Sequence, residues 1–149
     1  MFKTHTDDTQ MGWRYVTMSN RGYNIERELV RYLNDNDCGA VRVAGSGGGG
    51  SVAPKCDVLC YMKNQLYCLE VKSSSEDVIY IKNKQIEDLK SLSKLFNAIP
   101  MVCIKYSYIP YIVINPEHMD RTEEGTYKIT RKTTKYLSNR GYEIIQKLA

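Results

Sequence analysis

The stretch that decides the fold is Asp57-Val58-Leu59-Cys60-Tyr61-Met62-Lys63-Asn64-Gln65-Leu66-Tyr67-Cys68-Leu69-Glu70-Val71-Lys72. Its two apolar runs, at about 57–63 and 66–72, meet at a short polar segment, a pattern that predicts two strands joined as a hairpin. Side chains two positions apart on a strand share a face, so Glu70 and Lys72 project together while Val71 enters the opposite layer. Asp57 begins the first strand. We therefore expect two carboxylates and an ammonium group to converge at one edge of a sheet.

This grouping, spaced as D-x12-E-x-K, is suited to phosphodiester hydrolysis. Mg²⁺ prefers oxygen ligands and is usually held by one or two carboxylates, water and substrate phosphate. A lysine beside such an ion orients or deprotonates water and offsets developing negative charge. The pattern alone favours a solvated strand edge, because acids and lysines are common. The rest of the chain has to distinguish the two interpretations.

Length and composition are those of one globular domain: 149 residues, 42% of them hydrophobic and 26% charged. No apolar run approaches the roughly 20 residues that span a bilayer, and residues 1–8 lack a signal-peptide core. We expect no membrane partner and a cytoplasmic protein, in the host cytoplasm if the source is viral. We divide the chain into an N-terminal extension (1–18) and one domain (19–149), which comprises a core to about 115 and a basic segment (116–149).

The basic charge lies at the C-terminal end. Residues 121–149 hold seven Lys and Arg against three Glu, an excess of four that equals the net charge of +4 of the whole chain. This distribution fits a polyanionic partner, and on charge alone it fits a solvated tail equally well. The five cysteines form no C-x-x-C pair and only two histidines are present, so a zinc site has poor support. We interpret Cys60, Cys68 and Cys103, which lie in apolar runs, as reduced core residues.

Hydrophobic periodicity predicts the remaining elements. Ile25, Leu29 and Leu33 recur every four residues and predict a helix over 23–36, with Gly39 as its stop. A second helix is predicted over 82–96 and a largely helical segment over 132–149. Further strands are expected at 40–44, 78–81 (a short edge strand), 100–105, 111–114 after a turn at Pro110, and 127–130. The order α-β-β-β-α-β-β predicts an α/β fold in which a mixed central sheet is flanked by helices.

Several single residues are candidates for chemistry or binding. Glu26 lies beside the apolar stripe of the first helix, where either a metal or lysine partner or an exposed pairing with a neighbouring arginine accounts for it. Arg42 is a lone arginine in an apolar strand. The glycine run over 45–51 leads into a strand and lacks G-K-[ST], which excludes a nucleotide-binding loop. It fits an arm that orders around bent nucleic acid, although it also looks like an engineered linker.

Five blocks of sequence together resemble a known family. They are Asn24–Val30, Val41–Gly47, Asp57-Val58, Leu69–Ser73, and Val78–Ile81 followed by Gln85. In this order and at these spacings they resemble the archaeal-type Holliday junction resolvases of the PD-(D/E)xK nuclease superfamily, which has viral members. The resemblance covers about residues 19–106. The chain departs from the family pattern at Cys56, where proline is usual, and in its glycine-rich loop.

The resemblance implies a restriction-endonuclease-like core and a set of site residues. Asp57 and Glu70 would bind Mg²⁺, or Mn²⁺ in its place, with the Val71 carbonyl as a further ligand. Lys72 would position or activate the attacking water, and Glu26 would assist from the first helix. The loop residue Ser46 would lie near the scissile phosphate and count among the catalytic residues. The expected DNA contacts are Arg27, Arg42, Ser46, Lys55, Tyr80, Lys82 and Gln85.

The function expected from this set is Mg²⁺-dependent resolution of four-way DNA junctions by paired, symmetric nicks. The family acts as a homodimer, and a two-fold enzyme suits a two-fold substrate. One alternative is a restriction-like or repair endonuclease acting on linear, nicked or flapped DNA, because a fold does not fix a substrate. Another is a catalytically silent, architectural junction-binding protein, which the complete set of Glu26, Asp57, Glu70 and Lys72 argues against.

Overall fold

The computed structural model describes residues 18–43, 56–106 and 111–131. Its elements are α2 (Met18–Asp35), β1 (Gly39–Arg42), β2 (Val58–Met62), β3 (Gln65–Ser74), β4 (Val78–Ile81), α3 (Asn83–Leu95), β5 (Ile99–Tyr106), β6 (Ile112–Ile114), the 3-10 helix η2 (Pro116–His118), β7 (Asp120–Arg121) and β8 (Tyr127–Thr130). Each predicted helix and strand in these ranges is present, displaced by a few residues at most. The N-terminal extension, the glycine run, the turn at Pro110 and the helical segment predicted over 132–149 lie outside the described residues.

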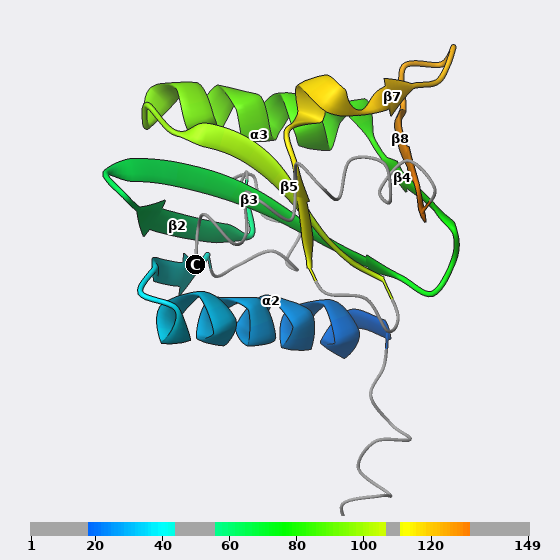
Figure 1. The fold of residues 1–149 in the computed structure, drawn as a ribbon. Helices are drawn as coiled ribbons and strands as arrows, with labels where there is room; N and C mark the ends of the chain where they lie inside the picture. The colour runs from blue at the N-terminus through cyan, green and yellow to red at the C-terminus, as the bar shows by residue number, and fades with distance from the viewer. Residues whose placement is uncertain (1–17, 44–55, 107–110, 132–149) are drawn as a thin grey trace, which may run out of the picture.

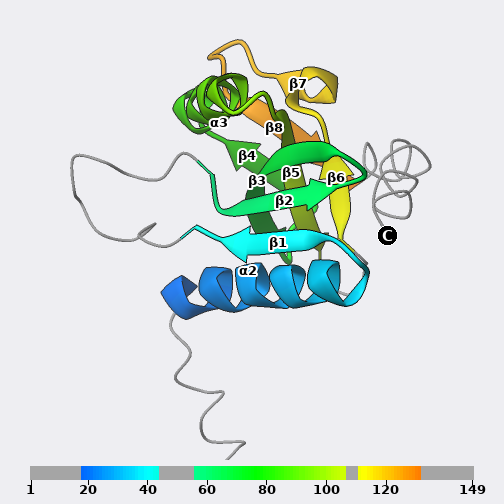
Figure 2. The same cartoon turned by 90° about the vertical axis from the view of Figure 1, so that its left-hand side faces the viewer.

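A five-stranded mixed sheet forms the middle layer, in the order β1-β2-β3-β5-β6. β3 and β5 run parallel, while the other neighbouring pairs are antiparallel. α2 covers one face of the sheet and α3 covers the other (Figures 1 and 2). This arrangement confirms the predicted α/β fold with a mixed sheet between helices.

A second, three-stranded sheet packs beside α3 in the order β4-β8-β7 (Figure 2). Its strands pair antiparallel, with Ile79 opposite Ile129 and Arg121 opposite Tyr127. The predicted edge strand 78–81 is therefore an edge strand of this second sheet. The sequence analysis predicted one sheet only, because β7 is too short to carry a periodic signal.

Two apolar clusters hold these layers together, one on each face of the central sheet. The cluster on the α3 side includes Ile81, Ile86, Leu89, Ile104 and Ile129. The cluster on the α2 side includes Leu29, Leu33, Val58, Cys60 and Leu69. Burial of this kind stabilises a domain by about 25 cal/mol for each Å² of apolar surface removed from water. All five cysteines are buried and free, which confirms Cys60, Cys68 and Cys103 as reduced core residues.

α2 ends earlier than predicted, so Gly39 is not its stop. The helix ends at Asp35, Asp37 adopts a left-handed φ of 61°, and the Cys38 amide donates to the Leu33 carbonyl at 3.0 Å. This is the hydrogen bond of a Schellman-type helix end, and a short polar residue such as aspartate tolerates the left-handed conformation better than most. Gly39 instead begins β1.

The β2–β3 hairpin fixes the register on which the site depends. Its two turn residues, Lys63 and Asn64, have φ values of 47° and 62°, the combination found in type I′ hairpin turns. The turn pairs Val58 with Leu69, so Asp57 lies beside the segment that carries Glu70 and Lys72. No helix within the three described ranges is both long and apolar enough to cross a membrane.

Candidate active site

Asp57 is held against the sheet by its backbone and by its side chain. Its amide donates to the Leu69 carbonyl, and its own carbonyl accepts from the Val43 amide, both at 2.8 Å. Its Oδ2 accepts from the Val71 amide at 2.7 Å. The aspartate therefore continues the hydrogen bonding of β2 by one residue, and its carboxyl group is fixed at the edge of β3.

Glu70 and Lys72 share one face of β3, as the sequence predicts, while Val71 packs against the cluster on the α2 side. Lys72 Nζ lies 2.9 Å from Glu70 Oε1. Gln85, in the first turns of α3, donates from Nε2 to the same oxygen at 3.4 Å. Glu70 is only 7% exposed, so its carboxylate depends on these two donors in place of water.

The negative charge of Asp57 disfavours the charged form of Glu70. Burial raises the pKa of Asp57, although its hydrogen bond from the Val71 amide acts in the opposite direction. Burial, reinforced by the negative charge of Asp57, raises the pKa of Glu70, and the Lys72 ammonium opposes this rise. A bound cation would relieve this repulsion, so the donor set fits a hard divalent ion.

Glu26 joins this region from α2, with Arg42 of β1 as its partner. Glu26 is 9% exposed, and Arg42 Nη1 donates to its Oε2 at 3.2 Å. Burial, and after it the charge of Asp57, raises the pKa of Glu26, while Arg42 opposes the rise. The acid thus follows neither expectation fully: it is buried, its ion-pair partner is an arginine from a strand, and the charge of Lys72 also lowers its pKa. Among the described residues, no group of three or more His, Cys, Asp and Glu has metal-binding geometry.

Comparison with known proteins identifies the family. The family model described as archaeal Holliday junction resolvase (Hjc) matches residues 17–146. The chain belongs to this family. The crossover junction endodeoxyribonuclease of Sulfolobus islandicus rod-shaped virus 1 is 32% identical over 107 residues, which cover 69% of this chain and 87% of that protein. The crossover junction endodeoxyribonuclease Hjc of Methanocaldococcus jannaschii is 33% identical over 96 residues, 64% of this chain and 66% of that one.

A solved resolvase structure has the same fold. The Archaeoglobus fulgidus Hjc structure, described as that of a Holliday junction resolvase from an archaeal hyperthermophile, superposes with a TM-score of 0.69 at 27% identity. The match covers 75% of this chain and 90% of that chain. The resemblance inferred from five sequence blocks is thereby confirmed at the level of family and fold.

The other predicted residues of this resolvase lie in different places. Arg27 is exposed on α2, Lys82 is exposed directly before α3, and Tyr80 is 60% exposed on β4. The predicted site residues Ser46 and Lys55 lie outside the described residues. The structure brings together seven of the predicted residues: Glu26, Arg42, Asp57, Glu70, Val71, Lys72 and Gln85.

Three contacts of the site were missed by sequence reasoning. The partner of Glu26 is Arg42, the Gln85 amide contacts a carboxylate where a phosphate or water was expected, and the Val71 amide binds Asp57. All three join residues at least 14 positions apart. The first two pairs depend on how the helices lie on the sheet, and the third depends on the register of the β2–β3 hairpin, so no local spacing signals them.

Proposed function

We propose that this resolvase is a structure-selective endodeoxyribonuclease that cuts four-way DNA junctions by Mg²⁺-dependent hydrolysis, with Mn²⁺ able to substitute. The observation that carries this proposal is the half-buried carboxyl group of Asp57 next to the buried carboxyl group of Glu70, both with raised pKa values, beside the ammonium group of Lys72. Two relatives are named crossover junction endodeoxyribonucleases, and nucleases of this family are in general divalent-metal dependent.

Asp57 and Glu70 would hold the ion, with the Val71 carbonyl as a third oxygen. A divalent ion there would polarise the scissile phosphate and lower the pKa of bound water. Glu26 of α2 would assist by adding a third negative charge near Asp57. Lys72 and Gln85, which contact Glu70, would keep its carboxylate oriented in a site with little water.

Lys72 is the group suited to handle the attacking water. Its ammonium lies within 2.9 Å of Glu70, at the same end of β3 as Asp57. There it can orient the water and neutralise the charge that develops on phosphate. Arg42, whose guanidinium contacts Glu26, would bind a second phosphate oxygen next to the scissile group.

The remaining predicted contacts would bind the arms of the junction through phosphate. They are Arg27, Ser46, Lys55, Tyr80 and Lys82. Phosphate contacts release counterions, so junction affinity should fall steeply as salt rises, by a factor set by the number of contacts. We place the whole activity in one nuclease domain (19–149), acting on DNA in the cytoplasm, or in the host cytoplasm if the source is viral.

The paired nicks would come from a homodimer. Val41 (59% exposed) lies on β1 and Tyr61 (52% exposed) on β2, while Leu95 (79%) and Phe96 (50%) lie at the C-terminal end of α3. An exposed apolar surface of this kind is typical of an interface, and a second copy suits a substrate with two-fold symmetry. The double substitution Leu95→Glu with Phe96→Glu should yield a folded monomer in sedimentation analysis, which cuts one strand at a time.

The test uses a labelled immobile four-way junction and a matched linear duplex. Each is incubated with the protein in Mg²⁺, in Mn²⁺ and in EDTA, with Asp57→Asn as the inactive control. We expect paired, symmetric nicks in the junction alone, absent with EDTA and with the variant. Equal cutting of the duplex would indicate a general nuclease. Tight junction binding with no cutting in either metal would indicate an architectural protein.

A further inference from the structure

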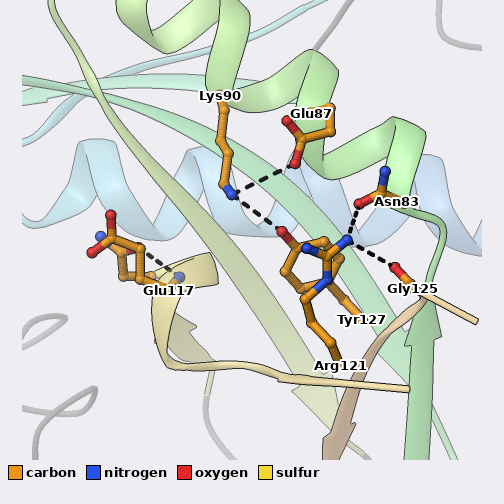
Figure 3. Close-up of polar contacts among 8 residues, drawn as sticks. Asn83, Glu87, Lys90, Glu117, Arg121, Gly125 and Tyr127 are labelled. Carbon is orange, nitrogen blue, oxygen red and sulfur yellow. Dashed lines mark hydrogen bonds and ion pairs between the residues drawn. The ribbon is translucent and has the colours of Figure 1, made fainter. Parts of the chain in front are cut away.

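The β7–β8 hairpin contacts α3 at two points, Asn83 and Lys90 (Figure 3). Arg121 of β7 donates from Nη2 to Asn83 Oδ1 at 2.6 Å, at the first residue of the helix. Tyr127 of β8 accepts from Lys90 Nζ at 3.1 Å, two turns further along. In the sequence Gln85 lies between these two points, so the hairpin contacts α3 on both sides of it.

Inside the hairpin, Arg121 and Tyr127 also hold each other. The Arg121 guanidinium lies over the Tyr127 ring, 4.7 Å from its centroid, and its Nη2 also donates to the Gly125 carbonyl at 3.2 Å. Gly125 turns the hairpin with a φ of +83°, a conformation that L side chains rarely adopt. Tyr127 is 3% exposed and belongs to the same apolar cluster as Ile86 and Leu89 of α3. The contact is therefore both polar and packed.

The start of α3 has little local support of its own. Its N-cap residue is Lys82, which makes no side-chain capping hydrogen bond, and no acidic residue lies in the first turn. Helix ends without a cap are held by tertiary contacts or they fray. For α3 the tertiary contact at its first residue is the hydrogen bond from Arg121.

The hydrogen bond between Gln85 of α3 and Glu70 is sensitive to small movements. Gln85 Nε2 reaches Glu70 Oε1 at 3.4 Å, close to the limit of a hydrogen bond. A displacement of α3 by a few tenths of an ångström would break or shorten this bond. The Glu70 carboxylate would then keep only Lys72 of its two side-chain donors described here.

We infer that Arg121 and Tyr127 are positioning residues for the nuclease site, because they hold the first turns of α3 where Gln85 can orient the Glu70 carboxylate. They act through Gln85 and touch neither the reacting phosphate nor the ion. The inference rests on the proposed function, since it assigns to the second sheet a role in the same site. It predicts that changes in the hairpin alter the cleavage step while junction affinity stays the same.

The kinetic test is a double-mutant cycle between Tyr127→Phe and Gln85→Ala. Tyr127 is buried, so removing its hydroxyl removes no DNA contact. We expect Tyr127→Phe to lower the single-turnover cleavage rate about threefold to tenfold, with junction affinity in EDTA unchanged. In the Gln85→Ala background the same change should cost nothing further. Equal losses in both backgrounds, a loss in affinity alone, or a Gln85→Ala variant as fast as the parent would overturn the inference.

A second measurement does not depend on catalysis. In ¹⁵N-labelled protein, the side-chain amide signals of Gln85 are identified by their loss in Gln85→Ala. Arg121→Ala and Tyr127→Phe should both move these signals, whereas Asp88→Asn, on the same helix but outside the hairpin contacts, should leave them in place. Unmoved signals in Arg121→Ala and Tyr127→Phe would overturn the inference even in an active enzyme. If the parent fails to cut junctions, the proposed function fails and these signals still decide the positioning.

Discussion

Two clusters of polar side chains differ in whether their surroundings favour the charged form. They are the candidate active site and the contact between α3 and the β7–β8 hairpin. In the active site, burial raises the pKa values of Glu26, Asp57 and Glu70, so their charged forms are disfavoured. In the α3–hairpin contact (Asn83, Lys90, Arg121 and Tyr127), the hydrogen bond to Tyr127 raises the pKa of Lys90, so its charged form is favoured. The same direction of shift has opposite meanings for an acid and a base.

This difference indicates that the α3–hairpin contact stabilises the fold, whereas the acidic cluster is suited to binding a ligand. Buried carboxylates that repel one another cost stability, and a protein retains them where a ligand repays the cost. The α3–hairpin contact brings together hydrogen bonds, a cation over an aromatic ring and apolar burial, all of which stabilise the fold. Substitutions in the two groups should therefore move activity and stability in opposite patterns.

The largest effect is expected for Asp57→Asn. The asparagine oxygen can still accept from the Val71 amide, but a ligand charge is lost, so single-turnover cleavage should fall by at least about a thousandfold. Junction binding should persist or tighten, because a charge that repels phosphate is removed. In EDTA at neutral pH, the free energy of unfolding should stay the same or rise by about 1 kcal/mol. A joint loss of folding and activity would contradict the role as a metal ligand.

The next effect concerns how the stability of the metal-free protein depends on pH. Below the ordinary pKa values of 3.8 for Asp57 and 4.5 for Glu70, both groups are protonated in the folded and the unfolded chain. As pH rises, the unfolded chain ionises first, so the metal-free protein should lose stability up to the raised folded pKa values. Chemical unfolding in EDTA from pH 4 to 8 measures this loss. Asp57→Asn should flatten the dependence of the free energy of unfolding on pH. An unchanged slope would show that ionisation of Asp57 does not destabilise the folded protein.

Adding the ion reverses this loss. At a Mg²⁺ concentration of one hundred times its Kd, binding to the folded state alone adds about 2.7 kcal/mol at 25 °C. We expect the melting temperature at pH 7.5 to rise with Mg²⁺ in the parent and to stay constant in Asp57→Asn. A rise of equal size in both proteins would place the bound ion elsewhere.

A smaller effect is expected in the α3–hairpin contact. Tyr127→Phe removes one buried hydroxyl that accepts from a charged lysine, and the free energy of unfolding should fall by about 1–2 kcal/mol. The matched control is Tyr80→Phe, in the same sheet but 60% exposed, which should change stability by less than about 0.5 kcal/mol. Equal effects of the two substitutions in urea unfolding would show that the hydroxyl contact contributes nothing specific.

The smallest effect belongs to an exposed ion pair that serves neither group. Lys84 and Asp88 pair at 2.6 Å on the outer face of α3, at positions i and i+4. Such pairs contribute about 0.3–0.5 kcal/mol, and salt screens them. Asp88→Asn should therefore lower stability by no more than this amount and leave cleavage unchanged. A larger loss would mean that α3 is held in place partly by its own surface charges.

The sequence determined the elements of this fold and the group of residues at β3. Alternation along β3 placed Glu70 and Lys72 on one face, and apolar spacing of four placed Leu29 and Leu33 on the buried face of α2. These predictions hold because they depend on the period of a single element, which neighbouring residues carry in full. The stop at Gly39 was wrong because a local rule for glycine was outweighed by Asp37 in a left-handed conformation.

Only the tertiary structure decided the partners of those residues. Arg42 meets Glu26, Gln85 meets Glu70, and Arg121 meets Asn83 across 16, 15 and 38 positions of sequence. The second sheet also depends on such a pairing, between β4 and β8, whose buried side chains belong to the same apolar cluster as those of α3. The physical reason is that periodicity says which face of an element is apolar, whereas the approach of two polar side chains follows from how whole layers pack. The sequence thus predicted which polar residues gather at β3, and the packing of α2, α3 and the β7–β8 hairpin decided which partners hold them.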